Sequence, residues 1–137
     1  MKHEAITEKV IAAYYAVYNT LGWGFLEKVY QGAMAVELAK RGIQFRPLAR
    51  IDVFYEGIRV GEYYADFIVE ECVIVELKAA ESIAPEHEAQ LLNYLKASNV
   101  DVGLLLNFGP QPRFKRKVFE TARFIAPTPS LPDPPST

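Results

Sequence analysis

The spacing of apolar residues changes once along the chain, near residue 43, and this change restricts the fold more than any other feature. Before it, apolar residues recur three or four apart, at Ile6, Val10, Tyr14, Val17 and Leu21. That spacing predicts a helix with one buried face over about 4–20. A second helical pattern covers about 25–41, and Gly42 stands where a C-cap glycine would. Two helices therefore precede the first strand.

After residue 43 the apolar residues form short runs typical of β-strands, at 43–45, 50–55, 58–63, 65–69 and 72–77. Tight turns at Glu56-Gly57 and Glu70-Glu71 predict an antiparallel meander. Pro85 then opens a third helix at its first turn, which we expect to continue to about Ala97.

The apolar run at 102–106 predicts a strand that is covered on both faces. A strand reached through a helix is usually parallel to its predecessor, so the sheet should be mixed and the fold class α/β. Residues 114–124 fit an edge strand or a helix equally well.

Length and composition indicate one domain over 1–125, followed by a proline-rich, disordered tail at 126–137. The single cysteine, Cys72, excludes an internal disulfide, a structural zinc site and an iron–sulfur cluster. No apolar stretch approaches the roughly 18 to 20 residues that span a bilayer, and the N-terminus lacks an apolar signal core. We therefore expect a cytoplasmic protein that does not enter a membrane.

Charge is unevenly distributed although the net charge is only -2. Acids dominate 56–88, whereas the segment that follows the last apolar run is basic, with Arg113, Lys115, Arg116 and Lys117. This pattern suits a protein that holds a cation in one place and a polyanion in another. On charge alone, an ordinary solvated surface explains the pattern better.

The strand at 72–77 and the residue after it carry the most informative charges. Glu76 and Lys78 are two residues apart and should share one face of the sheet. Pairing across the Glu70-Glu71 turn could bring Asp66 close to Glu76. A charge near a core costs several kcal/mol unless it is paired or bound to metal. If the triplet Glu76-Leu77-Lys78 is considered alone, a structural salt bridge between Glu76 and Lys78 is the better explanation.

Such a cluster suits phosphodiester hydrolysis, which uses a divalent cation to polarise the phosphate and activate water. Carboxylate oxygens are the ligands that Mg²⁺ prefers. Lys78 could steady the attacking hydroxide or the charge that builds on the phosphate.

Two predicted helices add further candidates. Glu27 shares a helical stripe with Tyr30, Met34 and Leu38, so it is a candidate inward carboxylate or a simple helix N-terminal acid. On the third helix, His87, Gln90 and Tyr94 are spaced along one side, although a lone His87 is more typical of a helix N-terminus.

These residues carry a resemblance to a known family. The heptapeptide Gly24-Phe-Leu-Glu27-Lys-Val-Tyr30 resembles the G-x-x-E-x-x-Y signature of the GxxExxY family, which is similar to the PD-(D/E)XK nuclease superfamily. The motifs follow in order with Asp66, the Glu76-Leu77-Lys78 triplet and Gln90-x-x-x-Tyr94, which resembles the QxxxY motif of recombination exonucleases. The segment 103–109, ending in Asn-Phe-Gly, also resembles a strand of the family.

The resemblance implies a restriction-endonuclease-like α/β core and a metal site. It implies that Asp66 and Glu76, with the Leu77 backbone carbonyl and with help from Glu27, hold Mg²⁺ or Mn²⁺. Lys78 would then serve the attacking water, while Gln90 and Tyr94 orient the site or the substrate.

The leading hypothesis is a metal-dependent nuclease that acts on nucleic acid, with DNA favoured over RNA as the substrate and with the basic residues Arg113, Lys115, Arg116 and Lys117 contacting the nucleic acid. The alternative is a non-catalytic nucleic-acid-binding or assembly module that keeps the nuclease fold and acts as a homodimer or through a protein partner.

Overall fold

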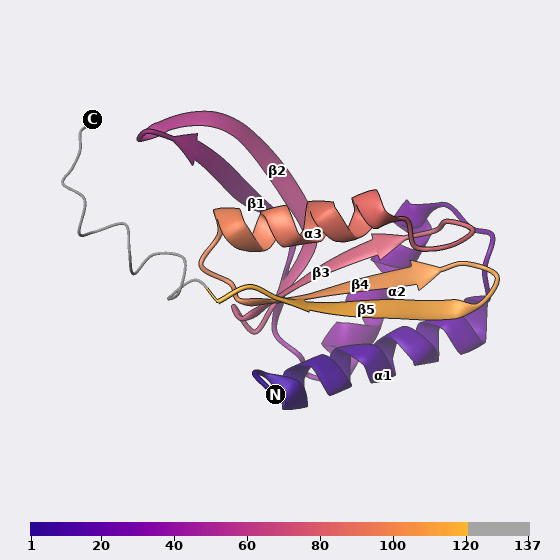
Figure 1. Ribbon diagram of the computed structural model, residues 1–137. Helices are drawn as coiled ribbons and strands as arrows, with labels where there is room; N and C mark the ends of the chain where they lie inside the picture. Colours follow the sequence, from indigo (N-terminus) through magenta and orange to yellow (C-terminus); the bar gives the residue numbers. More distant parts are fainter. Residues whose placement is uncertain (121–137) are drawn as a thin grey trace.

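The computed structural model describes residues 1–120, in which one mixed sheet of five strands is covered by helices on both faces (Figure 1). The predicted tail at 126–137 lies outside the described residues. The elements are, in chain order, α1 (Glu4–Leu21), α2 (Glu27–Lys40), β1 (Phe45–Tyr55), β2 (Ile58–Val69), β3 (Val73–Lys78), α3 (Pro85–Ala97), β4 (Val102–Phe108) and β5 (Pro112–Val118).

The three helices confirm the predictions, two made from apolar spacing and the third from Pro85, within two residues at each end. The first two bury the side that the spacing indicated, through Val10, Tyr14 and Val17 in α1 and through Tyr30, Met34 and Leu38 in α2. Pro85 opens α3 because the N–H that proline lacks has no partner in the first turn of a helix.

Two strands are longer than predicted. The runs at 43–45 and 50–55 join into β1, and those at 58–63 and 65–69 join into β2. Pro47 does not interrupt β1 because β1 is an edge strand, where a missing N–H costs no ladder hydrogen bond. The predicted turns are confirmed, with positive φ at Glu56 (51°) and Gly57 (80°) and at both Glu70 and Glu71.

The strands lie in the order β1-β2-β3-β4-β5, with β3 and β4 parallel and all other neighbours antiparallel. This confirms the mixed sheet. Strand β4 lies between β3 and β5 and is buried along its whole length, as its apolar run predicted. Residues 112–118 form an edge strand, β5, so the strand interpretation is correct for 114–118. Residues 121–124 of the ambiguous segment lie outside the described residues.

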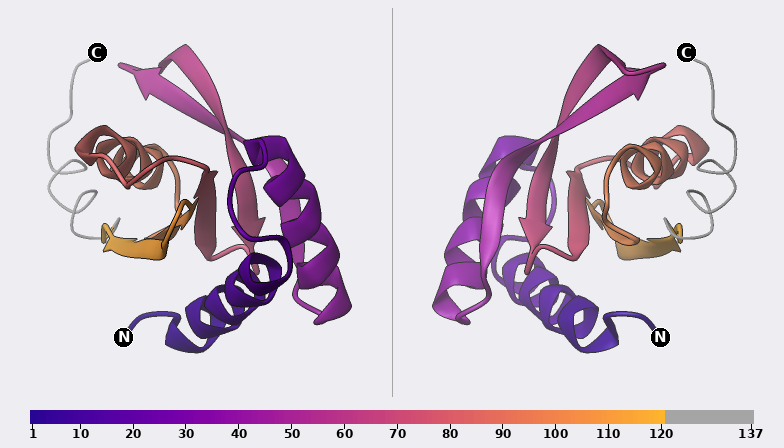
Figure 2. Two further views of the ribbon diagram at one scale, coloured as in Figure 1. Left: turned by 90° about the vertical axis from the view of Figure 1, so that its right-hand side faces the viewer. Right: turned by 90° about the vertical axis from the view of Figure 1, so that its left-hand side faces the viewer.

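The distal part of the β1–β2 hairpin leaves the sheet as a two-stranded arm. Strand β2 pairs with β1 along nearly its whole length, but with β3 only where Phe67 to Val69 faces Val73 to Val75. Figures 1 and 2 show the arm extending past α3 on the side of the sheet away from α1.

Two apolar cores lie on opposite faces of the sheet. The first packs α1 and α2 against alternate residues of the strands, including Phe67, Val75 and Leu77. The second packs α3 against the other face, and includes Ala65, Ile74, Tyr94 and Leu105. Because side chains alternate along a strand, the face that holds Glu76 is the α3 face.

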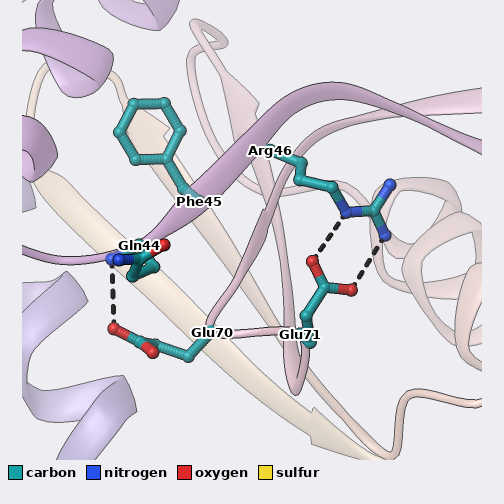
Figure 3. A pocket seen from close by; sticks show the side chains of 5 residues that line it. All are labelled: Gln44, Phe45, Arg46, Glu70 and Glu71. Atoms are coloured by element: carbon teal, nitrogen blue, oxygen red, sulfur yellow. Dashed lines mark hydrogen bonds and ion pairs between the residues drawn. The ribbon is translucent and has the colours of Figure 1, made fainter.

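Side chains also fasten the β2–β3 turn to the start of β1 (Figure 3). The Arg46 guanidinium donates two hydrogen bonds to the Glu71 carboxylate, at 2.7 and 3.1 Å, and the Gln44 N–H donates to Glu70 at 3.0 Å. The ion pair is exposed, so it adds little stability, but it fixes where β1 begins beside the turn.

Within residues 1–120, no helix is both long enough and apolar enough to cross a membrane.

Candidate active site

The candidate site lies where β2 and β3 separate. Regular pairing between them ends at Phe67 and Val75, and the next facing positions are Asp66 and Glu76. There the two side chains bridge the strands: Oε2 of Glu76 accepts a hydrogen bond from the Asp66 backbone N–H at 2.9 Å. In return, Oδ2 of Asp66 accepts one from the Leu77 backbone N–H at 2.8 Å. The structure therefore brings the two acids together.

The alternation of side chains along β2 breaks at Asp66. Residues two apart in a regular strand share a face, yet Phe67 belongs to the core under α1 and α2, whereas Ala65 belongs to the core under α3. Across the ladder from Asp66, Leu48 of β1 has a φ of 48°, in the left-handed region, and interrupts the pairing there. The two carboxylates therefore lie at an irregular point of β2, where its pairing with β3 ends.

Glu76 is the most strongly perturbed acid of the site. Its side chain is only 6% exposed. Burial, and then the negative charge of Asp66, raise its pKa from an ordinary 4.5 to about 8, against the lowering effects of the Asp66 N–H and of Lys78. Burial also raises the pKa of Asp66, with a further contribution from Glu27. A bound cation would offset both effects, since it favours the charged forms.

Lys78 ends β3 on the same face as Glu76, because Val75 and Leu77 point into the opposite core. Its positive charge lowers the pKa of both Asp66 and Glu76, so it lies near both carboxylates. Among residues 1–120, however, it forms no ion pair with an acid. The structural salt bridge considered from the sequence is therefore absent from this part of the chain.

Glu27 is the first residue of α2 and is exposed, whereas Tyr30, Met34 and Leu38 of the same stripe are buried. Its negative charge nevertheless raises the pKa of Asp66 and Glu76. Glu27 is thus a helix N-terminal acid at the edge of the site rather than an inward carboxylate.

The α3 side of the site is formed by Tyr94, whose side chain is 5% exposed. Burial, followed by the negative charge of Glu76, raises its pKa to about 12. Gln90 is half-buried one turn earlier on the same helix. His87 caps α3 instead, since its Nδ1 accepts a hydrogen bond from the Ala84 N–H at 3.1 Å.

The donor set suits a hard divalent cation. Each carboxylate uses one oxygen for a backbone hydrogen bond, and in the described part of the chain Oδ1 of Asp66 and Oε1 of Glu76 accept none. Residues 1–120 contain no group of three or more His, Cys, Asp or Glu residues placed to hold a metal. Two carboxylates and a backbone carbonyl are still a sufficient protein contribution for Mg²⁺, which keeps several waters.

Sequence reasoning gave Asn107 no role, but the structure places it directly beside the site. Asn107 is 1% exposed and pairs with Lys78 in the β3–β4 register. Its side chain accepts a hydrogen bond from the Ala80 N–H and donates one to the Ala80 carbonyl, each at 3.0 Å. A Cβ on Gly109 would lie 2.4 Å from that carbonyl, so only glycine fits there. The sequence feature that could have identified Asn107 was an amide side chain within an otherwise apolar run.

The four basic residues lie on the edge strand β5, but on two faces of the sheet. Lys117 forms an ion pair with Glu88 of α3 at 2.7 Å, and Lys115 also lowers the pKa of Glu88. Arg116 points to the other face, where it donates to the Lys2 backbone carbonyl near the start of α1. Arg113 and Lys115 are exposed. The sequence cluster is therefore not one continuous patch.

Solved structures with a similar fold include a nuclease. The crystal structure of an alkaline exonuclease (LHK-Exo) from Laribacter hongkongensis matches 75% of this chain, with a TM-score of 0.51 and 14% sequence identity. This chain covers only 60% of that exonuclease. The crystal structure of SSO0001 aligns with 96% of this chain, and the alignment covers 69% of the SSO0001 chain, with a TM-score of 0.54 and 18% sequence identity. Such low identities support the fold alone.

No protein of curated function matches the sequence significantly. A family model described as the PD-(D/E)XK nuclease superfamily, however, matches residues 4–119, which includes every described helix and strand. The mixed sheet between α1 and α2 on one face and α3 on the other agrees with that assignment. The chain therefore belongs to the PD-(D/E)XK nuclease superfamily.

Proposed function

We propose that this protein is a metal-dependent nuclease that hydrolyses phosphodiester bonds in DNA, and that it represents the GxxExxY branch of its superfamily. The observation that carries the proposal is the reciprocal bridging of β2 and β3 by Asp66 and Glu76. It holds two carboxylates close together in a buried place, although neither is neutralised by an ion pair within the described residues. Uncompensated acids of this kind are typical of functional sites rather than of structural ones.

In the proposed site, Asp66, Glu76 and the Leu77 carbonyl hold Mg²⁺ or Mn²⁺, and Glu27 adds negative charge at the edge. A bound divalent ion would polarise the scissile phosphate and lower the pKa of the attacking water.

The lysine and the α3 residues have separate roles in this proposal. Lys78, which has no acid partner in the described chain, stabilises negative charge on the attacking oxygen and on the phosphate. Tyr94 and Gln90 position the substrate strand from the α3 side.

Cleavage assays with labelled single- and double-stranded DNA and RNA, in Mg²⁺, Mn²⁺ or EDTA, test the proposal. Wild-type protein should cut DNA only with a metal, and Glu76→Gln and Asp66→Asn should abolish cutting. Glu8→Gln, which removes a charge from an exposed position of α1, is the matched control and should keep full activity.

Wild-type protein that binds nucleic acid but cuts none under any metal would contradict the proposal in favour of a binding module. Protein that neither binds nor cuts would favour an assembly role instead.

A further inference from the structure

A hollow of about 490 Å³ lies between the β1–β2 arm and α3. This volume is within the range of about 300–1,000 Å³ that is common for small-ligand sites. The arm lines it with Val53, Phe54 and Tyr63, and α3 with Asn93, Tyr94 and Lys96. The wall is therefore rich in aromatic rings and also carries one amide and one ammonium.

An irregularity in the arm directs an extra ring into this hollow. Val53 and Phe54 are consecutive, and consecutive residues of a regular strand face opposite sides. Both line the hollow because the β1–β2 register shifts between them. Bulges of this kind re-aim side chains and are common beside active sites. The Phe54 ring is thus presented to the hollow while 62% of the residue stays exposed.

The second aromatic wall joins the arm to the helix. The rings of Tyr63 and Tyr94 are 5.4 Å apart between centroids and inclined by 42°. Tyr94 is buried, but Tyr63 is 47% exposed and offers ring surface to a ligand. Asn93 and Lys96 lie on exposed positions of α3 beside these rings.

The hollow adjoins the candidate active site. Tyr63 is three residues before Asp66 on β2, which corresponds to about 10 Å along a strand. Tyr94 packs in the same core as Ala65, the residue that precedes Asp66, and as Ile74, two residues before Glu76. A nucleic-acid strand whose phosphate lies at the carboxylates could therefore place a neighbouring base in the hollow.

We propose that this hollow binds an unpaired nucleobase of the substrate, stacked on Phe54 and Tyr63, so that the protein acts on single-stranded nucleic acid or on frayed ends. The inference rests on the proposed function for the position of the scissile phosphate. Aromatic rings bind bases of any sequence through their π-faces. The Asn93 amide can form hydrogen bonds with the polar edge of the base, and the Lys96 ammonium can donate hydrogen bonds to a phosphate.

A base inside a duplex cannot enter such a hollow. Its two faces are covered by its neighbours in the stack, and an enzyme that takes a base into a pocket must first unstack and unpair it. Single strands and frayed ends avoid most of that cost, which is why the hollow favours them.

Binding to a short single-stranded oligodeoxynucleotide that carries 2-aminopurine, moved along the strand in a series, tests the inference in EDTA. Stacking on an aromatic ring quenches 2-aminopurine fluorescence, and anisotropy of an end label gives the affinity. For wild-type protein we expect binding, with quenching at one position of the series.

Phe54→Leu and Tyr63→Leu should each lower single-strand affinity roughly tenfold and remove the quenching, because base stacking on one aromatic ring contributes to that extent. Tyr55→Leu is the matched control. Tyr55 is an exposed residue of the same arm that does not line the hollow, so its variant should behave as wild type. Affinity for a blunt duplex should be unchanged in all three variants.

Wild-type protein that fails to bind the single strand, or Phe54 and Tyr63 variants that bind and quench as wild type does, would overturn the inference. A change of oligomeric state in Tyr63→Leu but not in the control variant, measured by sedimentation, would also overturn the inference. The hollow would then bind a second copy of the chain. Because the assay is run in EDTA, protein that lacks nuclease activity can still pass it, and active protein can fail it. The two proposals can therefore fail separately.

Discussion

The backbone N–H of Asp66 donates a 2.9 Å hydrogen bond to the carboxylate of Glu76, on the strand from which Asp66 is separating. The carboxylate of Asp66 in turn accepts from the Leu77 N–H. These contacts replace the backbone bonds that the two strands stop making at this point. They also fix the orientation of both acids, which leaves one oxygen of each for a ligand.

The burial of Glu76 predicts an unusual pH dependence of stability in metal-free protein. Because its folded-state pKa of about 8 exceeds its ordinary value of 4.5, the folded state binds more protons than the unfolded state between those values. The free energy of unfolding should therefore fall as pH rises from 5 to 8, by up to about 1 kcal/mol per pH unit.

Urea unfolding in EDTA at several pH values measures this slope. Glu76→Gln should remove most of it, because glutamine does not ionise. A wild-type slope equal to that of Glu76→Gln would contradict the assigned environment of this acid.

Metal binding should be strongest at high pH. The ion requires ionised carboxylates, and both Asp66 and Glu76 have raised pKa values. Calorimetry with Mn²⁺ should show binding at pH 8 that weakens at least tenfold by pH 6, and none in Asp66→Ala or Glu76→Ala. Glu8→Ala, at an exposed position of α1, should bind as wild type does. Heat that persists in both site variants would place the metal elsewhere.

Lys78→Ala should reduce turnover by about 10²–10³-fold while leaving folding and Mn²⁺ binding nearly unchanged. Since the charge of Lys78 lowers the pKa of Asp66 and Glu76, its removal should also shift the pH–rate profile toward higher pH. Lys40→Ala, at the exposed end of α2, is the control. Activity near wild type in Lys78→Ala would remove the lysine from the proposed mechanism.

Asn107 should act as a positioning residue for the segment after Lys78. Asn107→Ala removes both hydrogen bonds to Ala80 and leaves the N–H and carbonyl of this half-buried residue unpaired, at a cost of about 2 kcal/mol in unfolding free energy. At a temperature where the variant stays folded, kcat should fall while KM changes little. Asn107→Asp can still accept from the Ala80 N–H, but when ionised it sets a carboxylate oxygen against the Ala80 carbonyl oxygen, so its loss of unfolding free energy should grow as pH rises. The same pH dependence in Asn107→Ala would contradict this.

Much of this site followed from periodicity. The period of two in a strand indicated that Glu76 and Lys78 share a face, and the turn at Glu70-Glu71 indicated that Asp66 approaches Glu76. The fold class followed from the change of spacing near residue 43 and from the apolar run at 102–106. These are local patterns, and local patterns persist when the chain folds.

The rest depended on contacts that leave no periodic trace. These features are the left-handed backbone at Leu48, the register shift before Phe54 and the hydrogen bonds between Asn107 and Ala80. Each depends on how strands or loops that are distant in the sequence lie against one another. The segment 114–124 was ambiguous because its part in β5, residues 114–118, belongs to an exposed edge strand, in which apolar and polar residues alternate weakly. The basic run looked continuous in sequence, but alternation along β5 divides it between two faces.

That division makes the contribution of β5 to nucleic-acid binding testable residue by residue. Lys115 is exposed on the α3 face, which also holds the carboxylates, and it has no ion pair within residues 1–120. Arg116 is on the opposite face and donates to the Lys2 carbonyl. Lys115→Ala should weaken binding of all sequences alike and reduce the slope of log K against log salt by about 0.7 to 0.9, the effect of losing one phosphate contact. Arg116→Ala removes the same charge and should leave the slope unchanged. Equal slopes for the two variants would show that net charge, rather than the α3 face, attracts the nucleic acid.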